Sequence, residues 1–125
     1  MSFIRTIYYS YCIESLQVRG VRISKGTLDG SPSLTVSWIA VSESGVTYTV
    51  WYSTSSGTTT EPPSGVSELS GIFSASATLT DLSQGTTYYI WVAAVRDKDQ
   101  GPYSLRTSAI TFQGTSVSRL SMLLN

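Results

Sequence analysis

The stretch from residue 78 to residue 95, TLTDLSQGTTYYIWVAAV, reads as the end of one strand, a turn and then a long strand. From Tyr88 to Val95, mostly apolar side chains occupy both alternating sets of positions. A period of two over residues rich in β-branched and aromatic types predicts a β-strand and not a helix. Because both of its faces are largely apolar, we expect this strand to lie centrally in a sheet, with one face in the core.

The rest of the chain repeats this pattern in shorter runs that are separated by Gly-, Pro-, Asp- and Ser-rich turns. The expected strands cover residues 16–23, 33–39, 46–52, 66–69, 73–79, 88–95 and about 104–112, with loops at 26–32, 42–45, 53–64 and 96–102. Gly20 interrupts the first run and suggests either a β-bulge or a shift of the chain between sheets. Seven short strands with turn signals and no helical pattern predict an all-β, two-sheet antiparallel sandwich.

The alternation also predicts which side chains enter the core. These inward residues are Leu34, Val36, Trp38, Tyr48, Val50, Tyr52, Phe73, Ala75, Ala77 and Leu79, with Ile110 and Phe112 as the apolar anchors of the last strand. Trp38 is expected to be a large core aromatic at the end of its strand.

Three motifs stand in order within residues 16–112: Trp38, GVTYTVWY at residues 45–52 and LSQGTTY at residues 82–88. With these motifs, residues 16–112 resemble a fibronectin type III domain. Trp38 ends the second expected strand, where that family has its core tryptophan, and residues 45–52, GVTYTVWY, resemble the family's third strand. The most specific match is LSQGTTY at residues 82–88, which is similar to the family's Leu-x-Pro-Gly-Thr-x-Tyr corner; Gln84 replaces the usual proline. Residues 101–104, GPYS, resemble the family's approach to its last strand. The resemblance implies a seven-stranded, immunoglobulin-like sandwich of fibronectin type III topology.

The residues of this corner, 82–88, give a physical explanation for its conformation. The chain must cross there from one sheet to the other, with Leu82 closing the end of the core. Gly85 can adopt a turn conformation at little cost. Tyr88 is expected to pack its ring inside and to bond its hydroxyl to an upstream backbone group.

Two segments flank the domain expected at residues 16–112. Residues 1–15 alternate weakly, which fits either an added edge strand or the remnant of a preceding linker, and residues 113–125 are expected to be a C-terminal tail or linker. Cys12 is the single cysteine, and its simplest interpretation is a thiol without a role. Because no secretory signal pattern precedes the domain, we expect the chain to be a segment of a longer protein.

The composition excludes several classes of function. The 8 basic and 8 acidic residues balance, and 13% of positions are charged, so a basic surface for nucleic acid is unsupported. No apolar run is long enough to insert into a bilayer. The chain has no histidine, so its serines lack the usual general base, and Asp97 and Asp99 fall in a solvated turn that does not desolvate them for acid–base catalysis. We therefore expect no catalytic residues, no metal site, no cofactor and no enzymatic activity.

The best candidate for a binding site is aromatic. If Tyr48 and Tyr88 point inward, Trp51, Tyr89 and Trp91 point away from the core on adjacent strands. An exposed patch of that kind suggests protein contact, since Trp and Tyr dominate binding hot spots. The alternatives are that the linking loop or residues 1–15 cover these rings, or that they only stabilise the sheet. If these rings are exposed, we expect Trp51→Ala or Trp91→Ala to leave the fold largely intact and to weaken a contact with a partner or a neighbouring domain.

Three settings for such a domain remain open from the sequence. The first is a non-catalytic protein-binding or spacer module of an extracellular or cell-surface adhesion or receptor protein. The second is an accessory domain of a secreted enzyme or a phage structural protein. The third is an intracellular cytoskeletal array, which a lone reduced cysteine permits. In each case the partner is a protein or a neighbouring domain, and we expect the isolated domain to be monomeric.

Overall fold

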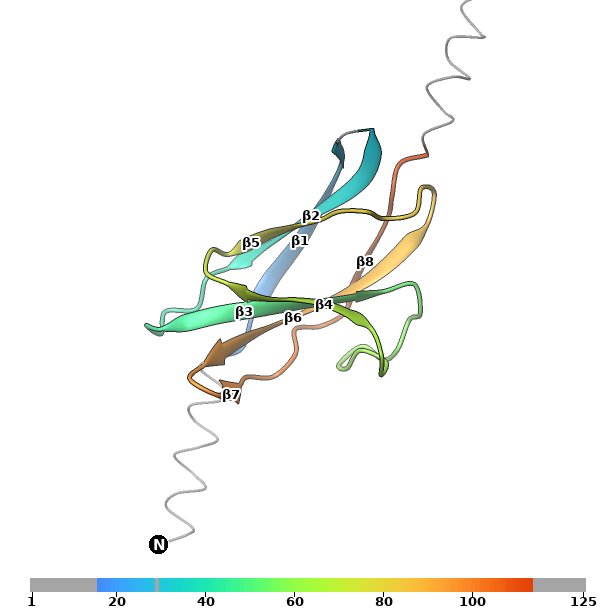
Figure 1. Ribbon diagram of the computed structural model, residues 1–125. Helices are drawn as coiled ribbons and strands as arrows, with labels where there is room; N and C mark the ends of the chain where they lie inside the picture. Colours follow the sequence, from blue (N-terminus) through green and yellow to red (C-terminus); the bar gives the residue numbers. More distant parts are fainter. Residues whose placement is uncertain (1–15, 29, 114–125) are drawn as a thin grey trace, which may run out of the picture.

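The structure, a computed structural model, describes residues 16–28 and 30–113 (Figure 1). All of its regular elements are strands: β1 (Arg19–Leu28), β2 (Ser31–Ile39), β3 (Val46–Ser53), β4 (Ser67–Ile72), β5 (Ser76–Leu79), β6 (Thr87–Arg96), β7 (Asp99–Gln100) and β8 (Thr107–Ile110). No helix occurs among the described residues, so none there is long and apolar enough to cross a membrane. The expected all-β sandwich is confirmed.

Two antiparallel sheets form the sandwich. One has three strands in the order β1-β2-β5, and the other has five, with β4-β3-β6-β7 in sequence and β8 also paired to β6. β3 and β6 pair without interruption from Val46 opposite Arg96 to Ser53 opposite Tyr89. β6 therefore lies in the interior of its sheet, as its apolar character on both faces predicts. The register of β1 shifts between Arg19 and Arg22, which confirms the bulge expected at Gly20.

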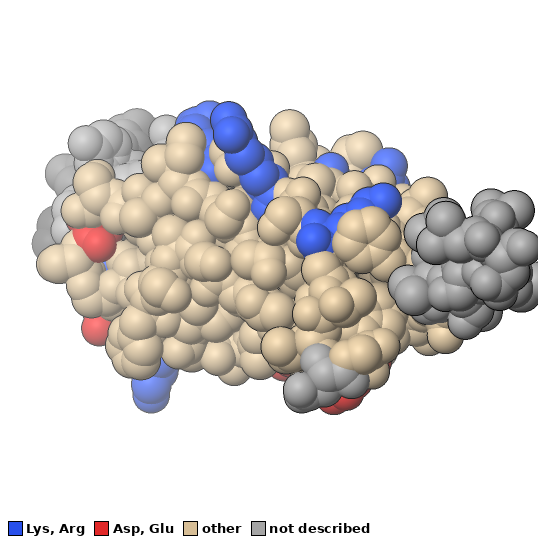
Figure 2. Space-filling view, turned by 90° about the horizontal axis from the view of Figure 1, so that it is seen from above, with Lys and Arg blue, Asp and Glu red and all other residues tan. Residues whose placement is uncertain are grey.

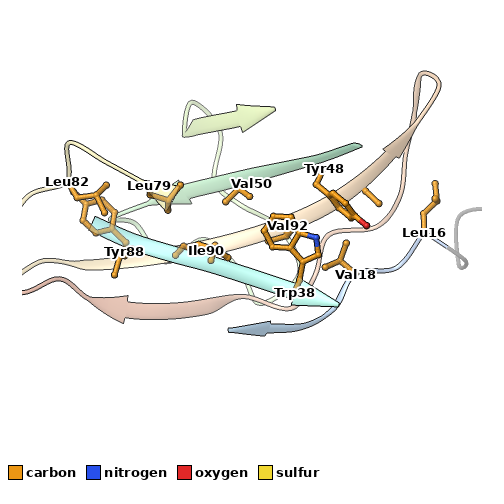
Figure 3. Packing of buried hydrophobic residues seen from close by; sticks show 13 residues of the cluster. Leu16, Val18, Trp38, Tyr48, Val50, Leu79, Leu82, Tyr88, Ile90 and Val92 are labelled. Atoms are coloured by element: carbon orange, nitrogen blue, oxygen red, sulfur yellow. The ribbon is translucent and has the colours of Figure 1, made fainter. Parts of the chain in front are cut away.

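The core lies between the two sheets and contains most of the residues that the alternation predicts. Its buried members are Leu16, Val18, Leu34, Val36, Trp38, Tyr48, Val50, Leu79, Leu82, Tyr88, Ile90, Val92 and Ala94. Trp38 and Tyr48 meet edge to face, with ring centroids 5.1 Å apart. Figure 3 shows this pair toward one end of the core and Leu82 and Tyr88 at the other end.

The corner at residues 82–88 has the geometry that its sequence suggests. Leu82 is buried in the core, and the Tyr88 hydroxyl accepts a hydrogen bond from the Ser83 backbone N–H at 2.9 Å. Gly85 has a φ of 59°, a left-handed conformation that a side chain would strain. Thr111, on the last strand segment, donates its hydroxyl to the Ser83 carbonyl at 2.6 Å. The corner is therefore tied both to itself and to the end of the domain.

A two-residue strand, β7, lies within the loop expected at 96–102, and β8 is shorter than the strand expected at 104–112, so the structure has eight strands where seven were expected. Between β7 and β8, the Gly101 N–H bonds to the Ala94 carbonyl at 2.8 Å, and the Ser104 N–H bonds to the Val92 carbonyl at 2.7 Å. The Ser104 hydroxyl also accepts the Val92 N–H at 2.9 Å, so this segment stays attached to β6 without forming a regular ladder. A Cβ at Gly101 would lie 2.6 Å from the Leu16 Cβ, which explains the glycine at that position.

Three predictions about side-chain burial and loops were wrong. Phe73 is 83% exposed because it lies in the connection between β4 and β5, before β5 begins at Ser76. Ile110 and Phe112 are about half exposed, because the alternation in β8 turns Ala109 and Thr111 inward instead. The expected loop at 26–32 is mostly strand, since β1 continues to Leu28 and β2 starts at Ser31.

The described chain enters and leaves the sandwich at opposite ends (Figure 1). Leu16 packs against Gly101, near β7, and Gln113 lies against Gly85 at the other end. The expectations for residues 1–15, Cys12 and residues 114–125 fall outside the described residues. Figure 2 shows one face of the molecule, which is largely uncharged and has most of its Lys and Arg side chains in its upper half.

Candidate functional site

The candidate site is the outer face of the five-stranded sheet, the face of β3 and β6 that points away from the core. Trp51 on β3 lies opposite Trp91 on β6, and Ser53 lies opposite Tyr89 one step further along. Tyr48 and Tyr88, at alternate positions, are members of the core cluster. The structure thus brings Trp51, Tyr89 and Trp91 to one face, as the period of two requires.

The β3–β4 loop, residues 54–66, covers part of this face. Trp91 is 0% exposed although it is not part of the core between the sheets. Its indole N–H donates to the Thr58 carbonyl of the loop at 3.1 Å. The expectation of an exposed Trp91 is therefore wrong, and coverage by the linking loop is the alternative that the structure supports. Trp51 and Tyr89 are only partly buried.

The β3–β4 loop holds its shape through a local turn. The Thr58 N–H bonds to the Glu61 carbonyl at 3.0 Å, and the Glu61 N–H returns a bond to the Thr58 hydroxyl at 3.0 Å. Pro62 and Pro63 follow directly and restrict the backbone further. Since this turn leaves the Thr58 carbonyl available, the loop can accept the Trp91 indole N–H without losing its own hydrogen bonds.

Arg106, between β7 and β8, fastens the loop to the sheet. Its backbone N–H donates to the Thr59 carbonyl at 2.8 Å, and its guanidinium donates to the Ser56 carbonyl at 2.9 Å. The same guanidinium lies over the Tyr89 ring, with its central carbon 5.3 Å from the ring centroid. This is cation–π geometry. Arg106 therefore occupies the place beside Tyr89 that a partner would otherwise contact.

An open groove remains beside the covered part of the face. Trp51 and Tyr103 line it and meet edge to face, with centroids 4.9 Å apart and ring planes at 79°. The groove measures about 530 Å³, and its other lining residues are Glu61, Pro62, Pro63, Ser64, Gly65, Val66 and Glu68. Both rings are partly exposed, so this groove is where the aromatic face is accessible.

A second groove, of about 850 Å³, adjoins the first. It lies between the start of β1 and the segment before β8, and its lining includes Val18, Val21, Pro102 and Leu105. Tyr103 and Glu61 line both grooves, so they form the boundary between them. Leu105 is 71% exposed and contributes apolar surface there. The accessible site is therefore a pair of adjoining grooves centred on Tyr103.

Two residues of this site, Tyr103 and Arg106, were absent from the sequence prediction. Both lie in the irregular segment between β7 and β8, which the sequence divided between a turn ending at residue 102 and a strand starting at about residue 104. The GPYS motif at residues 101–104 identified this segment, but it did not predict which way the side chains of the segment point. Only the pairing of Gly101 and Ser104 with β6 turns Tyr103 toward Trp51.

The side chains that ligate metals do not cluster among the described residues. No group of three or more His, Cys, Asp or Glu that could hold a metal ion occurs within residues 16–28 and 30–113. Asp97, Lys98 and Asp99 are exposed in the turn that joins β6 to β7. Arg96, at its start, pairs with Glu43 at 3.4 Å, and both side chains are partly exposed. What this arrangement offers is surface contact.

Replacing Arg106 by alanine should loosen the β3–β4 loop without unfolding the sandwich. The change removes the guanidinium bond to Ser56 and the contact with Tyr89 but keeps the backbone bond to Thr59. We expect amide hydrogen exchange in residues 54–61 to accelerate by about tenfold, the effect of losing roughly 1–1.5 kcal/mol of local stability. Thr107→Ala, one position further on, should leave exchange in the loop unchanged; equal exchange in all three proteins would show that Arg106 does not fasten the loop.

One comparison with known proteins, the one with family models, identifies a family. The sequence model described as "Fibronectin type III domain" matches residues 17–110. A comparison with curated proteins by sequence found no match. Among solved structures, the chain is similar to one described as "Myokine structure", with a TM-score of 0.56 and 19% identity over 78% of this chain and 98% of the other.

Two further structures have the same TM-score of 0.56. An Fn3-like protein from Clostridium thermocellum is 22% identical over 75% of this chain and 91% of its own. The fn3 domain of human contactin 1 is also 22% identical, over 78% of this chain and 85% of its own. At these identities the structural likeness concerns the fold alone.

Proposed function

The chain belongs to the fibronectin type III family, and we propose that it is a non-catalytic protein-binding module of a larger extracellular or cell-surface protein. Domains of this family are generally non-catalytic, and they are common modules of cell-surface proteins such as contactin. The contact surface that we propose is the first groove on the outer face of the five-stranded sheet, at Trp51 and Tyr103.

The placement of the two described ends supports a modular setting. The chain enters beside Gly101 and leaves beside Gly85, at opposite ends of the sandwich. A domain with this geometry can be joined end to end with neighbours while its outer face stays accessible. The same geometry suits a spacer, so the difference between spacer and binding module depends on whether the outer face makes contact.

The observation that carries the binding proposal is the partly exposed Trp51–Tyr103 pair beside an open groove. Aromatic side chains in that position present a large apolar surface with few rotatable bonds, and they dominate measured binding hot spots. Most of the remaining aromatic surface of this face is already covered by the β3–β4 loop. The accessible pair is therefore the part of the face that a partner can reach without rearranging the fold.

The test is binding of the whole 125-residue chain, displayed as a tetramer on streptavidin, to intact cells of the organism that encodes it. We expect binding that protease treatment of the cells removes. The double substitution Trp51→Ala, Tyr103→Ala should weaken it by about 30-fold or more, because two hot-spot side chains are lost. Thermal unfolding of the variant establishes that it is folded, and Tyr103→Ser provides a less disruptive second variant.

The matched control is a pair of exposed apolar residues away from the outer face. Ile39→Ala, Phe73→Ala removes as much exposed hydrophobic surface near the connections β2–β3 and β4–β5. We expect this variant to bind as the native chain does. If it loses binding while the Trp51, Tyr103 variant keeps it, the contact surface lies on those connections, and the proposal for the outer face is wrong.

A further inference from the structure

The first groove is lined by acidic residues as well as by the aromatic residues Trp51 and Tyr103. The charged residues that line it are Glu61 and Glu68, and no Lys or Arg is among its lining residues. The single ion pair within residues 16–28 and 30–113 joins Arg96 to Glu43, in the region of the β6–β7 turn. Neither Glu61 nor Glu68 forms an ion pair with a described basic residue, although Arg19 lines the adjoining groove that Glu61 also lines.

The backbone positions of Glu61 and Glu68 are defined relative to Trp51. Glu68 on β4 lies directly opposite Trp51 on β3 in the antiparallel register, which puts its side chain on the same face as the indole. Glu61 is held from the other side, because its backbone N–H and carbonyl close the turn with Thr58. Trp51, Tyr103 and two glutamates that form no ion pair with a described residue thus line one open groove.

We propose that the first groove accepts a basic side chain, arginine or lysine, from a partner polypeptide; this inference rests on the proposed binding function and specifies its partner. Two carboxylates attract a cation and can accept its hydrogen bonds, and an aromatic surface favours the same cation through its ring quadrupole. A neutral or acidic side chain would gain neither effect. The charge of the groove therefore selects the basic class.

A comparable contact between a basic side chain, an aromatic ring and an oxygen acceptor exists inside the molecule. On the neighbouring part of the outer face, the Arg106 guanidinium lies over the Tyr89 ring and bonds to the Ser56 carbonyl. A basic side chain in the first groove would repeat that combination of ring and oxygen acceptors, with charged acceptors in place of a carbonyl. The second groove, across Tyr103, gives room for the residues that flank the basic one, and it offers Val21, Pro102 and Leu105 as apolar contacts.

The test uses a short peptide, acetyl-Gly-Arg-Gly-amide, titrated into the full chain and followed by the three indole N–H resonances in NMR spectra. The citrulline peptide of the same shape, which lacks the charge, is the matched ligand control, and the lysine peptide distinguishes the two basic residues. We expect a saturable shift of the Trp51 resonance with the arginine or lysine peptide. Trp38 and Trp91 are buried, so their resonances should stay in place.

Variants of the chain provide a second part of the peptide-binding test. Glu61→Gln and Glu68→Gln should each weaken peptide binding by about two- to fivefold, the range for one partly exposed charge pair, and the double variant should weaken it further. Asp81→Asn removes an equal charge at an exposed position that does not line the groove, and it should have no effect. Equal binding of the citrulline peptide, or an equal loss in Asp81→Asn, would overturn the inference.

The cell-binding assay separates this inference from the proposed function. If Trp51→Ala, Tyr103→Ala abolishes cell binding while Glu61→Gln, Glu68→Gln binds normally, the groove contacts a partner but does not select a basic side chain, and the inference is wrong. If both variants bind cells as the native chain does, the proposed function of this face is wrong as well. Loss of cell binding in both, with the peptide results above, supports both proposals.

Discussion

Replacing Trp91 by alanine is expected to lower the free energy of unfolding by about 3–5 kcal/mol, a large part of the total stability of a domain of this size. Trp91 is fully buried between the sheet and the β3–β4 loop, and its indole N–H bonds to the Thr58 carbonyl. The substitution leaves a cavity under the loop and removes that hydrogen bond. Urea denaturation of the native and variant chains, followed by circular dichroism, measures the difference.

The informative control is the same substitution at the partner position across the strands. Trp51 lies opposite Trp91 but is only partly buried, so Trp51→Ala should cost less, about 1–2 kcal/mol. An exposed Trp91 would predict similar, small effects for both substitutions. Losses of about equal size at the two positions would therefore contradict the coverage of Trp91 by the β3–β4 loop.

The second large effect is expected at the corner between β5 and β6. Leu82→Ala should lower the free energy of unfolding by about 2–5 kcal/mol, because Leu82 is buried at the end of the core beside Tyr88. The loss should exceed that of a half-exposed leucine, since little can collapse into the space beneath the corner. Chemical denaturation provides the measurement.

Ser83→Ala is the control for Leu82→Ala. Ser83 takes part in the corner through its backbone, which donates to the Tyr88 hydroxyl and accepts from Thr111, and its own side chain is exposed. We expect this control to change the stability by less than about 0.5 kcal/mol. A small effect for Leu82→Ala would mean that the corner does not close the core.

The sequence predicts those parts of the fold that depend on interactions between residues close together in the chain. The period of two in residues 88–95 and the corner at 82–88 depend on neighbours within a few positions, and both were predicted correctly. Phe73, Ile110 and Phe112 were assigned to the core because they continue an apolar alternation. Their actual exposure depends on where β5 begins and on which face of β8 and the residues after it points to the core, and strand pairing decides both.

The same division applies to the candidate site. The strand pattern of β3 and β6 was enough to place Trp51, Tyr89 and Trp91 on one face. It could not show that Thr58 and Arg106, distant in the sequence from Trp91, close over that face. Nor could it show that Tyr103 turns toward Trp51 and that Glu68 lies opposite it.

The sequence by itself determined the class of this protein: an antiparallel sandwich of the fibronectin type III family, with Trp38, Tyr48, Leu82 and Tyr88 in its core. Those features follow from side-chain alternation and from one local corner. The tertiary structure alone decided which aromatic side chains remain accessible. Burial of Trp91 depends on a 13-residue loop whose docking needs hydrogen-bond donors from β6 and from the segment before β8. Contacts of that kind join residues far apart in the chain, so no local pattern encodes them.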